Sequence, residues 1–174
     1  MDINQPLELH REVVRPEYID WNGHMNVAYY VLVFDHATDE LFDHVGLDEA
    51  YRKGRGYTTF TLEAQVTYQR EVLEGDPLRI TTQLLDHDHK RAHYFHRMYH
   101  AEEGYLAATN ELLSLHIDAG KRRSAPFPDD ILARWEEIHA AHAVLARPPE
   151  AGRAMGIRRR PPGGPVDSGG SPDV

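Results

Sequence analysis

Alternating apolar and polar positions predict several β-strands along the chain. The alternation is clearest over residues 57–68, where every second side chain is apolar: Phe60, Leu62, Ala64, Val66 and Tyr68. Shorter alternating segments cover residues 7–14, 78–84 and 113–117. Turn sequences such as Gly75-Asp76-Pro77 separate them. We therefore expect half-buried strands arranged as an antiparallel meander.

A helical spacing of apolar residues replaces this alternation in two segments. Tyr30, Phe34, Leu41 and Val45 predict one long helix from Asn26, a good N-cap, to the residue before Gly46. A second amphipathic helix follows Pro128, with its apolar residues at Ile131, Trp135, Ile138 and Leu145. The order of elements predicts an α+β fold in which the long helix lies across one face of the sheet.

Five histidines fall within residues 87–100, namely His87, His89, His93, His96 and His100. In a helix, three of them could bind one metal ion. In a strand, His93 and His96 would face opposite sides, and no common site would form. Because alternating segments flank these residues, we favour the strand and expect no metal.

Composition limits the domain organisation and the class of function. The 174 residues suit one domain, and we assign it to residues 1–146, followed by a Pro-, Gly- and Arg-rich tail over 147–174 that we expect to be disordered. A net charge of −9 disfavours nucleic acid as a partner. The absence of cysteine excludes disulfides and cysteine nucleophiles. Without a long apolar stretch or a signal-peptide pattern, we expect a cytoplasmic protein with no membrane partner.

The densest chemical signal immediately precedes the long helix, in the sequence Asp20-Trp21-Asn22-Gly23-His24-Met25-Asn26. Free N–H groups at a helix start can stabilise an oxyanion, and a nearby carboxylate can act as nucleophile or general base. This pairing suits acyl transfer. In a simpler interpretation, Asp20 and Asn26 only cap the helix while Gly23 and His24 form the turn.

Asp20-x-x-Gly23-His24-x-Asn26, followed by Tyr29-Tyr30, Tyr68, Arg70 and Gly75-Asp76, resembles the hotdog-fold acyl-CoA thioesterases of the 4-hydroxybenzoyl-CoA thioesterase type. The resemblance spans about residues 7–140. It implies a long helix wrapped by an antiparallel sheet and acyl-CoA hydrolysis at the interface of a homodimer or homotetramer. Asp20 would be the catalytic carboxylate, the amide of Asn26 or Val27 the oxyanion contact, and His24 a residue that shapes the loop.

A narrower resemblance points to hotdog proteins of carnitine breakdown that are proposed to hydrolyse betainyl-CoA. It rests on the segments 90–93, 98–104 and 115–118. A quaternary ammonium group favours aromatic faces and negative charge, which could come from Trp21, Tyr29, Tyr30 and Asp35. The same aromatic residues could equally belong to the core between helix and sheet.

Other candidates lie further along the chain. Glu63 is a second carboxylate near the substrate, or a solvated or subunit-contact residue on the polar strand face. Lys121-Arg122-Arg123, together with Arg70 and Arg91, could bind CoA phosphates or form a solvated loop.

We therefore expect a thioesterase that hydrolyses a small acyl-CoA, with betainyl-CoA as a candidate, to the free acid and CoA without a metal or redox cofactor. A non-catalytic acyl-CoA sensor and a hotdog enoyl-CoA hydratase are the alternatives.

Overall fold

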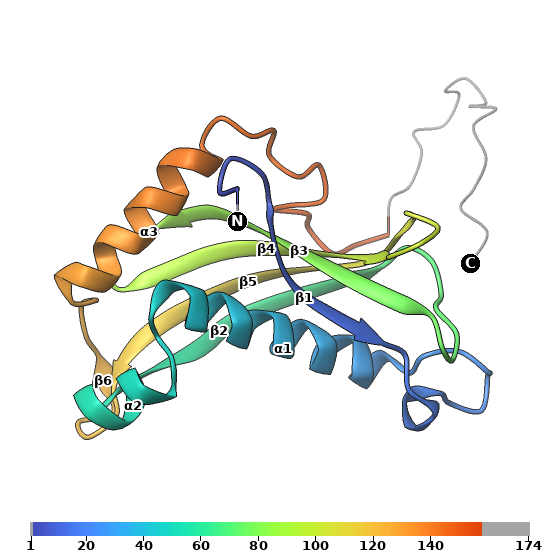
Figure 1. Cartoon of the computed structure of the whole chain (residues 1–174), viewed down its shortest axis with the longest axis horizontal. Helices are drawn as coiled ribbons and strands as arrows, with labels where there is room; N and C mark the ends of the chain where they lie inside the picture. The colour runs from blue at the N-terminus through green and yellow to red at the C-terminus, as the bar shows by residue number, and fades with distance from the viewer. Residues whose placement is uncertain (1, 158–174) are drawn as a thin grey trace.

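The computed structural model describes residues 2–157 and shows a curved antiparallel sheet wrapped around one long helix (Figure 1). The strands run in the order β1-β3-β4-β5-β2, with β6 beside β5. Their bounds are β1 Leu7–Val13, β2 Tyr57–Tyr68, β3 Pro77–His87, β4 Arg91–His100, β5 Leu106–Asp118 and β6 Arg123–Ser124. The helices are η1 Pro16–Tyr18, α1 Val27–Val45, α2 Glu49–Arg55 and α3 Asp129–His142. The predicted α+β architecture is confirmed, although α2 was not expected.

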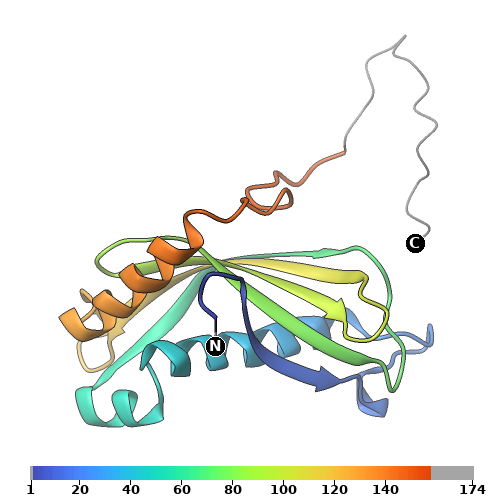
Figure 2. The same ribbon diagram turned by 45° about the horizontal axis from the view of Figure 1, so that its top comes forward.

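The long helix α1 begins and ends where its capping residues predict. The side chain of Asn26 accepts a hydrogen bond from the amide of Ala28, and Gly46 ends the helix in a left-handed conformation with φ of +89°. Phe34 and Leu41 are fully buried against the concave face of the sheet. Figure 2 shows the sheet curving over α1. Burial of each such side chain contributes about 1.5–3 kcal/mol, so packing stabilises the helix in this position.

The strand order corrects the expected simple meander. Strands β3, β4 and β5 do follow one another, but β2 pairs with β5 at one edge instead of with β3, which pairs with β1. Alternation is a local property that identifies a strand and its buried face. It carries no information on which neighbour the strand selects.

Strand β2 also departs from the predicted alternation. A β-bulge between Thr61 and Glu63 shifts its register against β5, so that Phe60 pairs with Leu115 and lies on the same face as Glu63. Phe60 and Leu62 are 45% and 50% exposed. The half-buried strand predicted over residues 57–68 is thus exposed at its centre, residues 60–64, because β2 is an edge strand.

Most of the histidine-rich segment is strand β4, as the alternation around it predicts, while His87 ends β3 and His89 lies in the turn between the two strands. His96 is fully buried between the hydroxyls of Thr38 and Thr82, at 3.0 and 2.8 Å. His93 faces the opposite side and contacts Glu111 at 2.8 Å. The two imidazoles therefore cannot share a ligand.

Helix α3 and the segment after it complete the fold. His142 at the end of α3 accepts the amide of Leu84 at Nδ1, at a distance of 2.9 Å. Figure 2 shows the following segment above the convex face of the sheet. There Glu150 pairs with Arg97 at 2.7 Å, and the amide of Gly152 donates to Glu111 at 2.6 Å. Glu150 and Gly152 of the predicted tail thus contact the sheet, and residues 158–174 lie outside the described residues.

Candidate active site

The loop between η1 and α1 is closed by its own backbone. Ile19 and Met25 form an antiparallel bridge, and within it the amide of Asp20 donates to the carbonyl oxygen of His24 at 3.1 Å. The amide of Gly23 donates to the carbonyl oxygen of Asp20 at 3.0 Å, with φ of +85° at Gly23. This left-handed backbone favours glycine, because a Cβ would be strained there. The loop therefore holds Asp20 beside the start of α1.

The carboxylate of Asp20 is partly exposed and partly fixed. Its Oδ1 accepts the backbone amide of Asn22 at 2.8 Å. Within residues 2–157, no protein group donates a hydrogen bond to its Oδ2. One oxygen thus orients the carboxylate, and the other is available to act as a base or a nucleophile.

The first amides of α1 differ in their partners. The amide of Asn26 donates to the carbonyl oxygen of Tyr18 at 2.9 Å. The amide of Ala28 donates to the side-chain Oδ1 of Asn26 at 3.0 Å, and the amide of Tyr29 donates to the backbone carbonyl oxygen of Asn26, also at 3.0 Å. In the described part of the chain, the amide of Val27 has no acceptor. Because the helix dipole places partial positive charge here, this amide is suited to hold a negatively charged oxygen.

A cleft of about 310 Å³ opens beside this amide, between the start of α1 and the end of β2. It is lined by His24, Met25, Val27, Tyr30, Tyr68, Gln69, Arg70 and Glu71. The rings of Tyr30 and Tyr68 meet edge to face, with centroids 5.2 Å apart. Burial raises the pKa of Tyr30 to about 12, so its ring stays neutral at physiological pH. The cleft thus combines two aromatic walls with the carboxylate of Glu71 and the guanidinium of Arg70.

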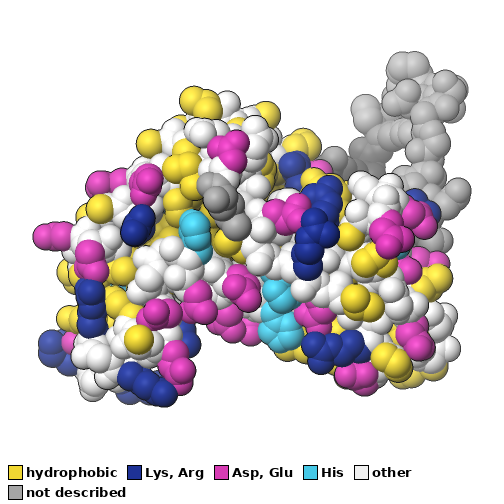
Figure 3. Space-filling view, in the orientation of Figure 1, with side chains coloured by type: hydrophobic (Ala, Val, Ile, Leu, Met, Phe, Trp, Pro, Cys, Tyr) yellow, Lys and Arg dark blue, Asp and Glu magenta, His cyan; other side chains and the backbone are white. Residues whose placement is uncertain are grey.

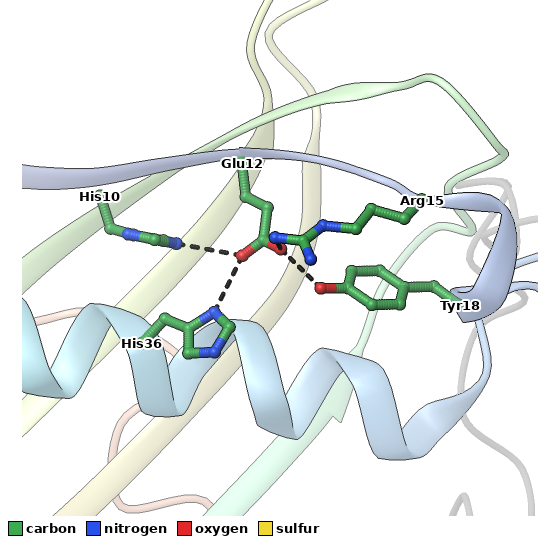
Figure 4. A network of polar contacts seen from close by, with 5 residues as sticks. All are labelled: His10, Glu12, Arg15, Tyr18 and His36. Atoms are coloured by element: carbon green, nitrogen blue, oxygen red, sulfur yellow. Dashed lines mark hydrogen bonds and ion pairs between the residues drawn. The ribbon is translucent and has the colours of Figure 1, made fainter.

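A polar network supports the loop from behind (Figure 4). The hydroxyl of Tyr18 donates to Glu12 Oε1 at 2.6 Å, and Glu12 Oε2 contacts His10 and His36 at 3.2 and 3.0 Å. Burial opposes ionisation of Glu12, but hydrogen bonds from Tyr18, His36 and His10 together lower its pKa below the ordinary value. Strand β1, helix α1 and Tyr18 are joined through this one carboxylate.

Comparison with known proteins decides the family. Residues 14–135 match the profile of the thioesterase-like superfamily. The chain belongs to the thioesterase-like superfamily. A Pseudomonas aeruginosa protein named betainyl-CoA thioesterase is 41% identical over 155 residues, which are 89% of this chain and 98% of that protein. A Rhizobium meliloti protein named L-carnitine dehydrogenase/betainyl-CoA thioesterase is 36% identical over 91% of this chain, which spans only 32% of that longer protein.

Solved structures support the same family and the hotdog fold. A Staphylococcus aureus protein in complex with CoA has a TM-score of 0.82 and 31% identity, covering 88% of this chain and 97% of that one. A Pseudomonas putida protein described as a putative thioesterase has a TM-score of 0.77 and 32% identity, covering 89% and 99%. The chain is therefore a hotdog-fold thioesterase, a hydrolase of thioesters.

This thioesterase brings only part of the predicted site to the cleft. His24, Val27, Tyr30 and Arg70 line it, while Asp20, Gly23 and Asn26 form the loop next to it. The ring of Tyr29 stacks on Tyr18 with centroids 4.5 Å apart. Trp21 is 94% exposed at the loop tip. Asp35 lies on the exposed side of α1.

The other predicted residues of the thioesterase lie elsewhere. Glu63 lines a hollow on the convex face with His93 and Glu111. Arg91 pairs with Asp88 at 2.6 Å beside the turn between β3 and β4. Lys121 pairs with Asp118 at 3.0 Å, and Arg122 and Arg123 follow it at the start of β6. Within one chain, the predicted basic residues thus form no single cluster with Arg70.

Sequence reasoning missed four cleft residues of this thioesterase. Met25 carried no chemical signal, and Tyr68 was counted only as an apolar strand position and as part of the resemblance. Gln69 and Glu71 directly follow the end of β2, where the chain leaves the sheet beside α1. The polar sequence after a long strand was the one signal that could have identified them.

Within residues 2–157, no helix is long and apolar enough to cross a lipid bilayer.

Proposed function

We propose that this thioesterase hydrolyses betainyl-CoA to betaine and free CoA, at a site completed by two copies of the chain. The observation that carries the proposal is the aromatic cleft beside the unpaired amide of Val27. The proposal is further supported by the name of the Pseudomonas aeruginosa relative, which aligns with this chain over nearly its whole length.

The proposed chemistry uses the start of α1 and the loop before it. The thioester carbonyl oxygen accepts the Val27 amide, which stabilises the oxyanion as the carbonyl carbon becomes tetrahedral. Asp20 either takes a proton from an attacking water or attacks that carbon directly, in which case loss of the thiolate leaves a mixed anhydride on Asp20 that a water then hydrolyses to betaine and the free carboxylate. The C–S bond then breaks, and CoA leaves as a thiolate that takes up a proton. The Asn26 amide is not a donor to the oxyanion in this scheme, because Tyr18 already accepts it.

The cleft also suits the trimethylammonium group of betaine. This group has no N–H to donate, so its recognition depends on aromatic faces and on nearby negative charge. Tyr30 and Tyr68 supply the aromatic walls, and Glu71 supplies a carboxylate at the rim. Arg70, which packs over the ring of Tyr105 at 3.9 Å, lies beside the same cleft as a candidate for a CoA phosphate.

The exposed edge of β2 is the proposed dimer contact. An edge strand presents unpaired backbone groups that pair readily with a second copy. Exposed apolar side chains lie along this edge and along the neighbouring turns of α1, including Leu62, Tyr68, Val27 and Val31. Tyr68 and Val27 also line the cleft, so the second copy would cover its open side.

Thiol release from a panel of acyl-CoAs tests the proposal. We expect betainyl-CoA to exceed acetyl-CoA and its neutral isostere 3,3-dimethylbutanoyl-CoA in kcat/KM. Asp20→Asn keeps the acceptor for the Asn22 amide and should lower kcat by about 10²- to 10⁴-fold. Asp39→Asn, an exposed change on α1, should not alter it.

Three outcomes would contradict the proposal. Tight binding of intact acyl-CoA without thiol release would indicate a sensor. Loss of an enoyl-CoA double bond without thiol release would indicate a hydratase. Equal rates with betainyl-CoA and acetyl-CoA would leave the thioesterase activity established but would exclude betaine as the preferred acyl group.

A further inference from the structure

The network of Figure 4 brings three metal-ligating side chains together outside the proposed active site. Among residues 2–157, only His10, Glu12 and His36 place three such ligand atoms within 4.8 Å of one another. His10 and Glu12 project from β1 toward α1, which carries His36. None of the three lines the cleft. We propose that His10 Nε2, Glu12 Oε2 and His36 Nδ1 bind a divalent transition-metal ion of the Zn²⁺ type.

Two of the three distances between the donor atoms are close to those of a tetrahedral site. Bonds of about 2.0–2.1 Å place neighbouring ligand atoms of a tetrahedral site about 3.3 Å apart. Glu12 Oε2 lies 3.2 Å from His10 Nε2 and 3.0 Å from His36 Nδ1. The ligand atoms of His10 and His36 lie within 4.8 Å of each other, so the two imidazoles turn toward a common point when one ion contacts all three donors.

The carboxylate of Glu12 is held in the orientation that a ligand requires. Its side chain is 6% exposed, and its Oε1 accepts Tyr18 at 2.6 Å and Arg15 at 3.1 Å. Both contacts leave Oε2 directed at the two imidazoles (Figure 4). Such outer hydrogen bonds to a ligating carboxylate are typical of metal sites, because they fix the geometry of the ligand.

The site is also accessible to an ion from solvent. The side chain of His36 is 36% exposed and that of His10 15% exposed. Figure 3 shows histidine side chains at the surface of this face, over β1 and α1. Three protein ligands leave a fourth position for water.

The donor types select the class of ion. Two imidazole nitrogens and one carboxylate suit Zn²⁺ and neighbouring divalent transition metals, whereas Mg²⁺ and Ca²⁺ prefer sites made of oxygen ligands. A bound ion would link β1 to α1. Through Tyr18, whose carbonyl oxygen accepts the Asn26 amide, it would also stiffen the loop that carries Asp20. The ion has a structural role in this proposal and takes no part in hydrolysis.

Calorimetric titration of untagged, EDTA-dialysed full-length protein with ZnCl₂ tests the site. We expect one Zn²⁺ per chain for the natural protein and no comparable binding of MgCl₂. His10→Gln and His36→Gln should each weaken Zn²⁺ binding on the order of a hundredfold or more. His44→Gln, an exposed change on the same helix, should leave it intact.

Spectroscopic measurements on the natural protein test the same site without any substitution, so they do not depend on the folding of a variant. Imidazole ¹⁵N resonances should shift on Zn²⁺ addition for His10 and His36, and Co²⁺ should give the visible absorption of a four-coordinate site. No stoichiometric Zn²⁺ binding overturns the proposal. Binding that survives either substitution, or imidazole shifts confined to other histidines, overturns it as well.

Discussion

The amide of Asn26 donates to the carbonyl oxygen of Tyr18 at 2.9 Å, which commits one of the two amides expected to meet the substrate. The side chain of the same residue takes up the amide of Ala28. Asn26 thereby fixes the loop and caps the helix at once. Val27, which lies between Asn26 and Ala28, has an unpaired amide within the described residues, and this amide lies at the cleft.

Val27→Pro should remove the oxyanion contact while keeping the fold. Proline is tolerated at the first helical position, and Asn26 before it has φ of −69° and ψ of 145°, a conformation compatible with a following proline. Loss of one such donor should lower kcat by about 10²- to 10³-fold. Val27→Ala retains the amide and is the matched control in the thiol-release assay. If both variants are equally active, the oxyanion is held elsewhere.

Tyr68→Leu should impair recognition of the cationic acyl group more than that of a neutral one. A cation–π contact contributes about 0.5–2 kcal/mol, so kcat/KM for betainyl-CoA should fall roughly 2- to 30-fold. The rate with 3,3-dimethylbutanoyl-CoA should change little, and Tyr68→Phe should preserve both rates because it keeps the aromatic face. An equal loss with both substrates would show that Tyr68 only shapes the cleft.

Leu62→Glu should dissociate the proposed dimer. A carboxylate in the exposed centre of β2 would be buried on pairing, and an unpaired buried charge is strongly unfavourable. Light scattering should then give a mass near the 19.9 kDa of one chain instead of twice that value. Val13→Glu, on the opposite edge strand β1, is the control, since Val13 is also exposed. Dissociation by Val13→Glu alone would assign the interface to β1.

Buried His96 should make the protein less stable in acid. Burial lowers its pKa to about 3, whereas an unfolded chain has the ordinary value of 6.5. Below pH 6.5 the unfolded state therefore binds more protons than the folded state, and the free energy of unfolding falls by up to about 1.4 kcal/mol per pH unit for this residue. Above pH 6.5 the contribution is constant.

Urea unfolding between pH 7.5 and 5 measures this dependence. His96→Gln retains polar groups for Thr38 and Thr82 but does not titrate, so its free energy of unfolding should vary less with pH. Burial also lowers the pKa of His142 and His116, so some dependence should remain. His44→Gln should retain the full dependence. A variant His96→Gln with an unchanged slope would contradict the assignment.

The sequence alone determined the elements of this protein and the place of its proposed catalytic loop. Helix α1, five long strands and α3 follow from periodicity, capping residues and turns, because these signals act between residues close in the chain. The Asp20–Asn26 motif was recognisable for the same reason.

Only the tertiary structure decided which distant residues meet. The position of β2 beside β5, the bulge that exposes Phe60, and the contact of His10 and Glu12 with His36 depend on packing between segments far apart in sequence. We assign the oxyanion contact to the amide of Val27 and not to that of Asn26, because the Asn26 amide donates a hydrogen bond to the carbonyl oxygen of Tyr18. Local sequence patterns do not predict such partners, because the interactions between them form only when the whole sheet closes around the helix.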